Sequence, residues 1–152
     1  RELIDLNFTS QAFAVRAFLP RMKRSGQGDI VIIGSEAALR GSRKGSLYCA
    51  SKFALRGFAQ ALREETAGAG IRVCLVNPGM VRTPFFDELD FEPADAPDNH
   101  VLPEDVAAVV CSAIQAREGT VVDEINLSPQ KRVIDFHRHR QQDEDAGRAE
   151  GS

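Results

Sequence analysis

Apolar residues recur at helical spacing over residues 3–22, and this pattern predicts a long helix with one buried face. The residues of that predicted face are Leu6, Phe13, Ala14, Ala17, Phe18 and Met22. A second helix is predicted over residues 46–67, with an alanine-rich start that would let another helix or a ligand approach closely. The AGAG sequence then ends it. A third helix is predicted over residues 102–116, where Pro103 and two acidic residues occupy the first turn.

Three short apolar runs alternate with these helices. Residues 29–35 (DIVIIGS) and 71–79 (IRVCLVNPG) have the composition of strands that are buried on both faces of a parallel sheet. Residues 121–129 (VVDEINLSP) are the third predicted strand. The alternation of helix and strand predicts an α/β fold, a Rossmann-like doubly wound parallel sheet with right-handed crossovers.

The remaining segments are less regular. Residues 83–101 are rich in proline, acidic residues and aromatics, so we expect an irregular, mobile loop. Its aromatic residues are predicted to line a substrate mouth: Phe85, Phe86 and Phe91. Residues 130–152 are charged and poor in apolar side chains, which is typical of a flexible tail. The chain is therefore divided into a domain of residues 1–129 and a tail of residues 130–152.

Composition narrows the possible functions. The chain has 152 residues, enough for one domain with a core, and a formal net charge of −3 with both signs mixed. Because there is no basic stripe, neither nucleic acid nor a membrane is an expected partner. No apolar run approaches the roughly 20 residues that span a bilayer, and the N-terminal sequence is unlike a signal peptide, so the expected location is cytoplasmic.

The cysteines and histidines are not spaced as metal ligands, so no metal is predicted. The three cysteines lie far apart in apolar surroundings, and we interpret them as reduced core thiols: Cys49, Cys74 and Cys111. The histidines are expected at the surface.

One helix face carries a tyrosine and a lysine one turn apart. Tyr48, the only tyrosine, and Lys52 are four residues apart in the second predicted helix. Ser35 ends the first predicted strand, and open parallel sheets bind ligands beyond the carboxyl ends of their strands. A phenol has a pKa of about 10 in water, and a nearby ammonium favours its ionised form. These groups could exchange a proton with an alcohol or carbonyl oxygen while hydride moves to or from a cofactor.

Simpler interpretations stay open for each of these residues. Tyr48 and Lys52 could be an incidental pair on a helix surface. Ser35 could cap the turn after its strand, and Asn7 could bond locally within its helix.

Four segments occur in a characteristic order. They are DLNFTSQAF with Asn7, DIVIIGSEAA with Ser35, YCASK with Tyr48 and Lys52, and NPGMVRTP over residues 77–84. In this order and spacing they resemble the short-chain dehydrogenase/reductase family in its compact, single-domain form. The resemblance covers residues 3–129. A tyrosine and lysine at this spacing are a weak signal alone, whereas the four segments together are a strong one.

The resemblance implies an enzyme that moves hydride between NAD or NADP and a small-molecule secondary alcohol or carbonyl. Tyr48 would be the acid/base, and Ser35 would orient the substrate oxygen. Lys52 would favour the ionised tyrosine and bond the nicotinamide ribose, while the backbone of Asn7 would hold a relay water. Cofactor contacts are implied for Tyr48, Lys52, Pro78, Gly79, Val81 and Thr83. The two long helices would form the interface of a homodimer or homotetramer.

The chain also departs from the family pattern. The family's glycine-rich dinucleotide turn and its Asn-Asn-Ala-Gly strand would precede Arg1, and neither occurs in this sequence. The expectation is therefore a C-terminal part of the fold, lacking its N-terminal half, in which the strand of residues 29–35 has an exposed edge. The alternative to an enzyme is a catalytically silent fragment or interaction module on the same scaffold, unable to bind cofactor alone. The substrate and the choice between NAD and NADP stay open.

Overall fold

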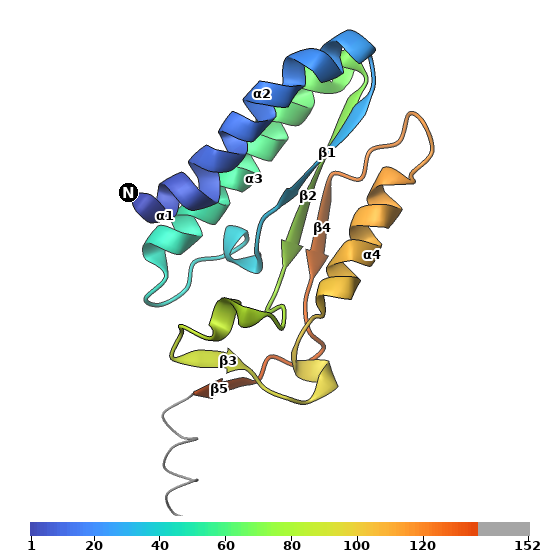
Figure 1. Cartoon of the computed structure of the whole chain (residues 1–152). Coiled ribbons are helices and arrows are strands. Elements are labelled where there is room, and N and C mark those ends of the chain that lie inside the picture. Colours follow the sequence, from blue (N-terminus) through green and yellow to red (C-terminus); the bar gives the residue numbers. More distant parts are fainter. Residues whose placement is uncertain (137–152) are drawn as a thin grey trace, which may run out of the picture.

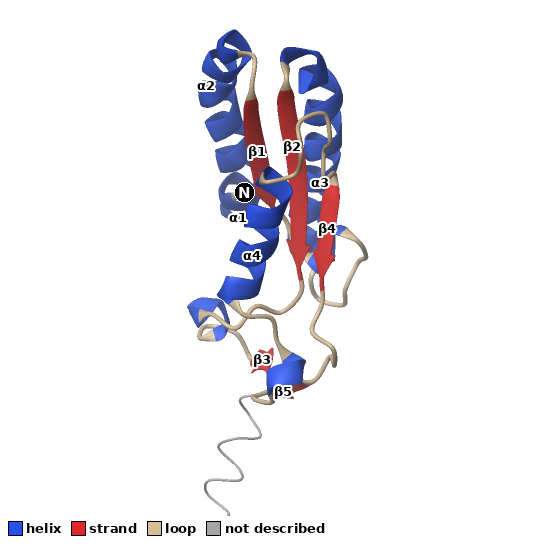
Figure 2. Ribbon diagram, turned by 90° about the vertical axis from the view of Figure 1, so that its right-hand side faces the viewer, coloured by secondary structure: helices blue, strands red, loops and turns tan. Residues whose placement is uncertain are grey.

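The computed structural model describes residues 1–136, and its centre is a parallel sheet with the strand order β1-β2-β4. The strands of this sheet are β1 (Gly28–Ile33), β2 (Ile71–Pro78) and β4 (Glu124–Leu127). The helices are α1 (Glu2–Ile4), α2 (Ser10–Ser25), α3 (Ser46–Thr66) and α4 (Pro103–Ile114). Figure 1 and Figure 2 show α2 and α3 on one face of the sheet and α4 on the other. The predicted α/β architecture is confirmed.

β2 is the central strand, and its side chains separate two apolar clusters. The cluster on the α2 and α3 face contains Ile32, Leu55, Ala59, Leu62, Val73 and Leu75. The cluster on the α4 face contains Cys74, Val76 and Ala113, with the valines of α4 packed against them. Successive residues of a strand point to opposite faces, so an unbroken apolar run is what a strand covered on both sides requires.

β1 lies at one edge of the sheet. It pairs in parallel with β2 along its whole length, and among residues 1–136 no strand pairs with its other edge. Ile33, near the end of β1, is 41% exposed. The exposed edge predicted for this strand is therefore present in the described part of the chain, and such an edge favours pairing with another strand.

The first helical region differs from its prediction. It runs from α1 into α2 through a π-helical turn at Asp5–Thr9. The predicted buried face is wrong, because Leu6, Phe13 and Phe18 are between 59% and 71% exposed. The side chains packed on the sheet are instead Phe8, Val15 and Leu19. This helix has apolar residues on two sides, and spacing alone does not tell which side meets the sheet.

Two short antiparallel strands were not predicted. β3 (Phe91–Pro93) pairs with β5 (Ile134–Phe136) beyond the carboxyl end of the main sheet (Figure 1). Three residues are too few for a recognisable alternation of apolar and polar positions. β5 lies in the segment predicted as a tail; residues 137–152 lie outside the described residues, and the flexible tail and its boundary stay predictions.

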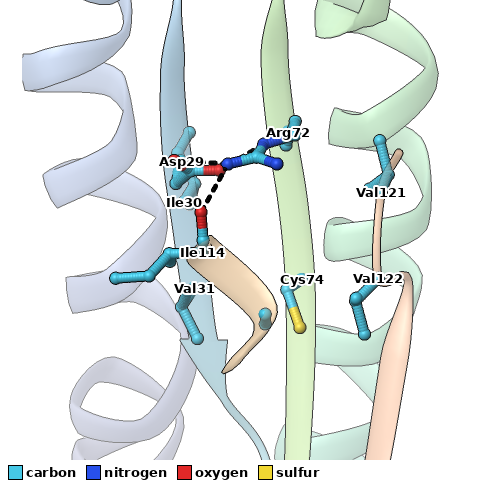
Figure 3. A pocket seen from close by; sticks show the side chains of 9 residues that line it. Asp29, Ile30, Val31, Arg72, Cys74, Ile114, Val121 and Val122 are labelled. Carbon is cyan, nitrogen blue, oxygen red and sulfur yellow. Dashed lines mark hydrogen bonds and ion pairs between the residues drawn. The ribbon is translucent and has the colours of Figure 1, made fainter. Parts of the chain in front are cut away.

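An arginine joins the strands to α4 at the opposite end of the sheet (Figure 3). Arg72 Nε and Nη2 donate to the Asp29 carboxylate at 2.7 and 3.1 Å. Its Nη2 and Nη1 also donate to the carbonyls of Ile114 and Ala116, each at 2.8 Å. The last carbonyls of a helix lack partners within the helix, so Arg72 satisfies the end of α4. The enclosed space is about 10 Å³, which is too small for an organic ligand.

The cysteines follow their prediction in two of three cases. Cys49 and Cys74 are buried free thiols, and burial raises the pKa of Cys74. Cys111 is exposed on α4, so the prediction of a core thiol is wrong there. α4 is apolar at most positions, and sequence neighbours therefore do not reveal which side Cys111 faces. Over residues 1–136, no helix has both the length and the apolarity to cross a bilayer, and the cytoplasmic location stays a prediction.

Candidate active site

Ser35 lies immediately after β1, at the carboxyl edge of the sheet. Its backbone is extended, and its N–H donates to Asn77 Oδ1 at 3.4 Å. Its Oγ accepts from the Ala37 N–H at 3.1 Å and so caps the 3-10 turn of Glu36–Ala38. That turn packs against α3. The capping role that the sequence left open is therefore present, and the hydroxyl retains a hydrogen that it can donate to a ligand.

Tyr48 and Lys52 lie one turn apart on the same side of α3. Lys52 Nζ is 5.7 Å from the centroid of the Tyr48 ring, within the range of a cation–π contact. Burial lowers the pKa of Lys52, because desolvation penalises its ammonium form. The spacing predicted from the sequence therefore brings a cation against the phenol ring.

The π-helical turn holds Asn7 against α3. Asn7 Nδ2 donates to Ser51 Oγ at 3.2 Å, and the Ser51 hydroxyl donates to the Tyr48 carbonyl at 2.7 Å. Gln11 Nε2 donates to the Asn7 backbone carbonyl at 3.1 Å. π-helical turns break the regular ladder of carbonyls and often occur at functional sites. The sequence did not single out Ser51, although its place inside YCASK could have identified it, and it is completely buried.

The loop after β2 packs closely over the end of β4. The Gly79 N–H donates to the Leu127 carbonyl at 2.7 Å, and Pro78 before it is buried. A Cβ at Gly79 would lie 3.1 Å from Pro129 Cδ and 3.3 Å from the Leu127 oxygen. Glycine therefore permits the close approach that the sequence predicted for this turn.

Val81 and Thr83 continue this loop toward a cavity. Val81 forms a β-bridge with Val101, and Thr83 Oγ1 donates to the Val81 carbonyl at 3.4 Å. The cavity has a volume of about 300 Å³, the lower end of the range for small-molecule sites. Its lining residues are Arg82, Thr83, Pro84, Phe86, Asp87, Glu92 and Pro93.

The aromatic residues of this loop have different surroundings. Phe86 is buried, with its ring centroid 5.2 Å from that of Phe85 and 5.9 Å from that of Phe91. Phe85 is 60% exposed. Of the three phenylalanines predicted to line a substrate mouth, Phe86 lines the cavity, and it is also the centre of the packing within the loop.

Two polar residues at this edge were missed by the sequence reasoning. Glu36 follows Ser35, and its Oε2 is 3.2 Å from Arg132 Nη2, in the segment before β5. Asn77 is completely buried at the end of β2 and accepts the Ser35 N–H. An asparagine directly after the apolar run VCLV was the available signal for Asn77, because a buried amide needs partners.

Comparisons with known proteins show the family of this chain. The family model described as short chain dehydrogenase matches residues 1–93. The chain belongs to the short-chain dehydrogenase/reductase family. Sepiapterin reductase of Chlorobaculum tepidum is 35% identical over 126 residues, covering 83% of this chain and 50% of that protein. The NADP-dependent 3-hydroxy acid dehydrogenase of Schizosaccharomyces pombe is 32% identical over 146 residues, covering 92% of this chain and 56% of that protein.

A solved structure shares the fold. An alcohol dehydrogenase from the archaeon Thermococcus sibiricus, complexed with 5-hydroxy-NADP, matches with a TM-score of 0.74 and 24% identity. The match covers 87% of this chain and 55% of that chain. This chain therefore spans about half the length of the relatives it matches, consistent with part of a Rossmann-like fold.

Proposed function

We propose that the protein to which this chain belongs is an NAD(P)-dependent oxidoreductase acting on a secondary alcohol or carbonyl. The observation that carries the proposal is the Tyr48 and Lys52 pair on α3, which Ser51 ties to Asn7. Ser35 stands at the carboxyl edge of the sheet, where such sheets bind ligands. The names of the relatives, a reductase and a hydroxy acid dehydrogenase, support the same reaction class.

The proposed chemistry divides the reaction between a proton and a hydride. In the oxidative direction, the substrate hydroxyl gives its proton to the Tyr48 oxygen as the carbon–oxygen bond becomes a carbonyl. The Lys52 ammonium stabilises the phenolate that accepts this proton, and the Ser35 hydroxyl donates a hydrogen bond to the substrate oxygen. A nicotinamide cofactor, when bound, would supply the acceptor for the hydride of the carbinol carbon. Reduction of a carbonyl runs through the same groups in reverse.

The loop after β2 suits the nicotinamide half of the cofactor. Glycine at position 79 lets this loop pack against Pro129 and the Leu127 carbonyl, and the loop so formed would be one wall of the nicotinamide site at the carboxyl edge. Pro78, Val81 and Thr83 would complete that wall, and the Lys52 ammonium supplies donors for ribose hydroxyls. The proposed cofactor is NAD or NADP, which relatives and structural neighbours bind.

Turnover with a simple carbonyl tests this function. Purified protein is mixed with NADH or NADPH and butane-2,3-dione, and oxidation of the cofactor is followed by absorbance. The expected result is saturable oxidation with one of the two cofactors. Absence of turnover with both cofactors over a panel of small ketones, and with NAD and NADP over 3-hydroxy acids, would contradict the proposal.

A second candidate function is a catalytically silent interaction module. The observations that favour it are the open edge of β1 and the match to about half of each relative. Titration of the 152-residue chain with NADH and NADPH, followed by calorimetry, separates the candidates. Tight, saturable binding to the chain alone would contradict the silent module.

We also propose that copies of the chain associate through the exposed apolar side chains of the two long helical regions. Those side chains are Leu6, Phe13 and Phe18 on the first region and Leu47 and Phe53 on α3. Large exposed apolar side chains favour association, because pairing removes them from water. A homodimer or homotetramer is the expected assembly.

Placing a charge in this face is expected to weaken the assembly. The variant Phe18→Glu buries a carboxylate at the proposed interface, so its sedimentation coefficient should fall toward that of a monomer. Arg16→Gln, an exposed change on the same helix, is the control and should sediment as the wild type does. A monomeric wild type, or a Phe18→Glu variant that sediments like an oligomeric wild type, would rule out this interface.

A further inference from the structure

A buried amide at the carboxyl end of β2 links this strand to β4 and to the segment that follows β1. Asn77 is completely buried, and its Nδ2 donates to Glu124 Oε1 at 3.1 Å and to Asn126 Oδ1 at 2.9 Å, both on β4. Its Oδ1 accepts the Ser35 N–H at 3.4 Å. The second carboxylate oxygen of Glu124 accepts from Arg56 Nε of α3 at 3.1 Å. The hydrogen-bonded chain therefore runs from α3 across β4 and β2 to Ser35.

The direction of the Asn77 amide is determined by its partners. Both neighbours on β4 present oxygen acceptors, so the Asn77 NH₂ group faces them and its carbonyl oxygen faces Ser35. Glycine before Ser35 makes room for this oxygen, because a Cβ at Gly34 would lie 2.3 Å from Asn77 Oδ1. The sequence thus combines a glycine and a buried amide at the one point where the carbonyl must approach the β1 backbone.

The backbone leaves the sheet at Ser35. The Gly34 N–H makes the last ladder bond to β2, to the Val76 carbonyl at 2.7 Å, and the next N–H, that of Ser35, goes to the Asn77 side chain. Two residues later, the Ala37 N–H donates to Ser35 Oγ. The Asn77 carbonyl therefore holds the backbone of the residue whose hydroxyl, in the proposed function, bonds the substrate oxygen.

We propose that Asn77, Glu124 and Arg56 are positioning residues that fix the direction of the Ser35 hydroxyl for the reaction. Arg56 lies four residues after Lys52 on α3, so the same hydrogen-bonded chain ties Ser35 to the helix that carries Tyr48 and Lys52. The two parts of the candidate active site, Ser35 after β1 and the Tyr48 and Lys52 pair on α3, are thereby held at a fixed relative position. This inference rests on the proposed oxidoreductase function.

Two variants in the whole protein test the proposal. Asn77→Ala removes the acceptor of the Ser35 N–H. Arg56→Gln removes the ion pair with Glu124 at the partly exposed end of the hydrogen-bonded series, so it can be measured even if Asn77→Ala does not fold. With butane-2,3-dione and the cofactor it supports, kcat should fall by up to about 100-fold, because a small misplacement of a reacting group has that effect. The Kd for the cofactor should not change.

The control is another arginine of α3. Arg63 donates to the Val73 and Asp123 carbonyls at 3.1 and 2.6 Å and also crosses from α3 to the sheet, without contacting Asn77 or Glu124. Arg63→Gln should lower the midpoint of thermal unfolding and leave kcat unchanged. Equal loss of kcat in Arg56→Gln and Arg63→Gln would overturn the proposal, because both changes would then act through general stability.

The decisive measurement is a double-mutant cycle with Ser35→Ala. If Asn77 and Arg56 act through Ser35, adding either variant to Ser35→Ala should lower kcat no further than Ser35→Ala alone. If the fold-losses in kcat of the single variants multiply in the double variant, the residues act independently and the proposal is overturned. Hydrogen exchange at the Ser35 amide separates this inference from the function on which it rests. If the wild type has no turnover, faster exchange of that amide in Arg56→Gln than in Arg63→Gln still supports the positioning role, and equal exchange overturns it.

Discussion

Replacing Tyr48 with phenylalanine is expected to lower NAD(P)-linked turnover by about 10²–10⁴-fold, the range that a positioned acid or base contributes. The change removes one oxygen and keeps the ring against which Lys52 Nζ lies at 5.7 Å. Because the hydroxyl contributes the proton transfer, kcat should fall while the Kd of the cofactor and the midpoint of thermal unfolding stay close to those of the wild type. Steady-state kinetics with butane-2,3-dione and calorimetry measure the three quantities.

The comparison with Ser35→Ala makes this prediction sharper. Ser35 would only orient and polarise the substrate oxygen, so its loss should lower kcat by less than the loss of the Tyr48 hydroxyl does. Undiminished turnover in Tyr48→Phe would remove Tyr48 from the mechanism. A large loss accompanied by an equally large loss of thermal stability would mean that the hydroxyl is a packing group instead.

Replacing Lys52 with methionine is expected to lower turnover by roughly 10²–10³-fold, the effect typical of losing one preorganised donor. Methionine keeps an unbranched side chain of similar length and loses the cation that would stabilise the Tyr48 phenolate and bond the ribose. Unlike Tyr48→Phe, this variant should also raise the Kd of the cofactor. Turnover and Kd measured together distinguish the two roles, and an unchanged Kd would contradict the ribose contact.

The same variant is expected to change how stability depends on pH. Burial lowers the pKa of Lys52 below its usual value of 10.5, so the folded chain holds a charged ammonium at a cost. Between the lowered pKa and 10.5, the unfolded chain binds more protons, and the contribution of Lys52 to stability rises with pH over that window. Lys52→Met should therefore gain stability at pH 7 relative to the wild type, and the gain should shrink as the pH rises through the window.

Chemical denaturation at several pH values measures this gain. The control is Lys23→Met, because Lys23 is exposed in the last turn of α2. Its stability relative to the wild type should not follow the same trend with pH. A gain in Lys52→Met that is constant with pH would show that the added apolar surface, rather than the buried charge, is the cause.

The sequence predicted the fold where a local pattern was enough to define an element. β1 and β2 contain the apolar runs IVII and VCLV and are each flanked by glycines, and the PED sequence at the start of α4 is a typical helix beginning, so all three lie where they were predicted. The first helical region has apolar residues on two sides, and only the sheet decides that Phe8 rather than Phe13 is packed inside. β3 and β5 depend on pairing across about forty residues, which no local pattern contains.

Within the candidate site, the sequence predicted only the residues whose reactive side chains stand in a recognisable local motif. Tyr48 and Lys52 are on one helix, so spacing alone placed them together, and Ser35 followed from its position at a strand end. Asn77 and Glu124 act through partners on other strands, and such contacts need the register of the sheet. That register, with Leu75 opposite Glu124, is set by tertiary packing and cannot be read from either strand alone.

In the proposed function, one edge of the sheet gathers the proton-transfer residues and the nicotinamide. A crystal structure of the protein with the oxidised form of the cofactor it uses tests this arrangement. We predict that the nicotinamide ring lies against Pro78 and Gly79, with its ribose hydroxyls in hydrogen-bond contact with Lys52 Nζ and its reactive carbon facing the Tyr48 hydroxyl. A dinucleotide bound elsewhere, or one whose nicotinamide lies away from Tyr48, would contradict the account.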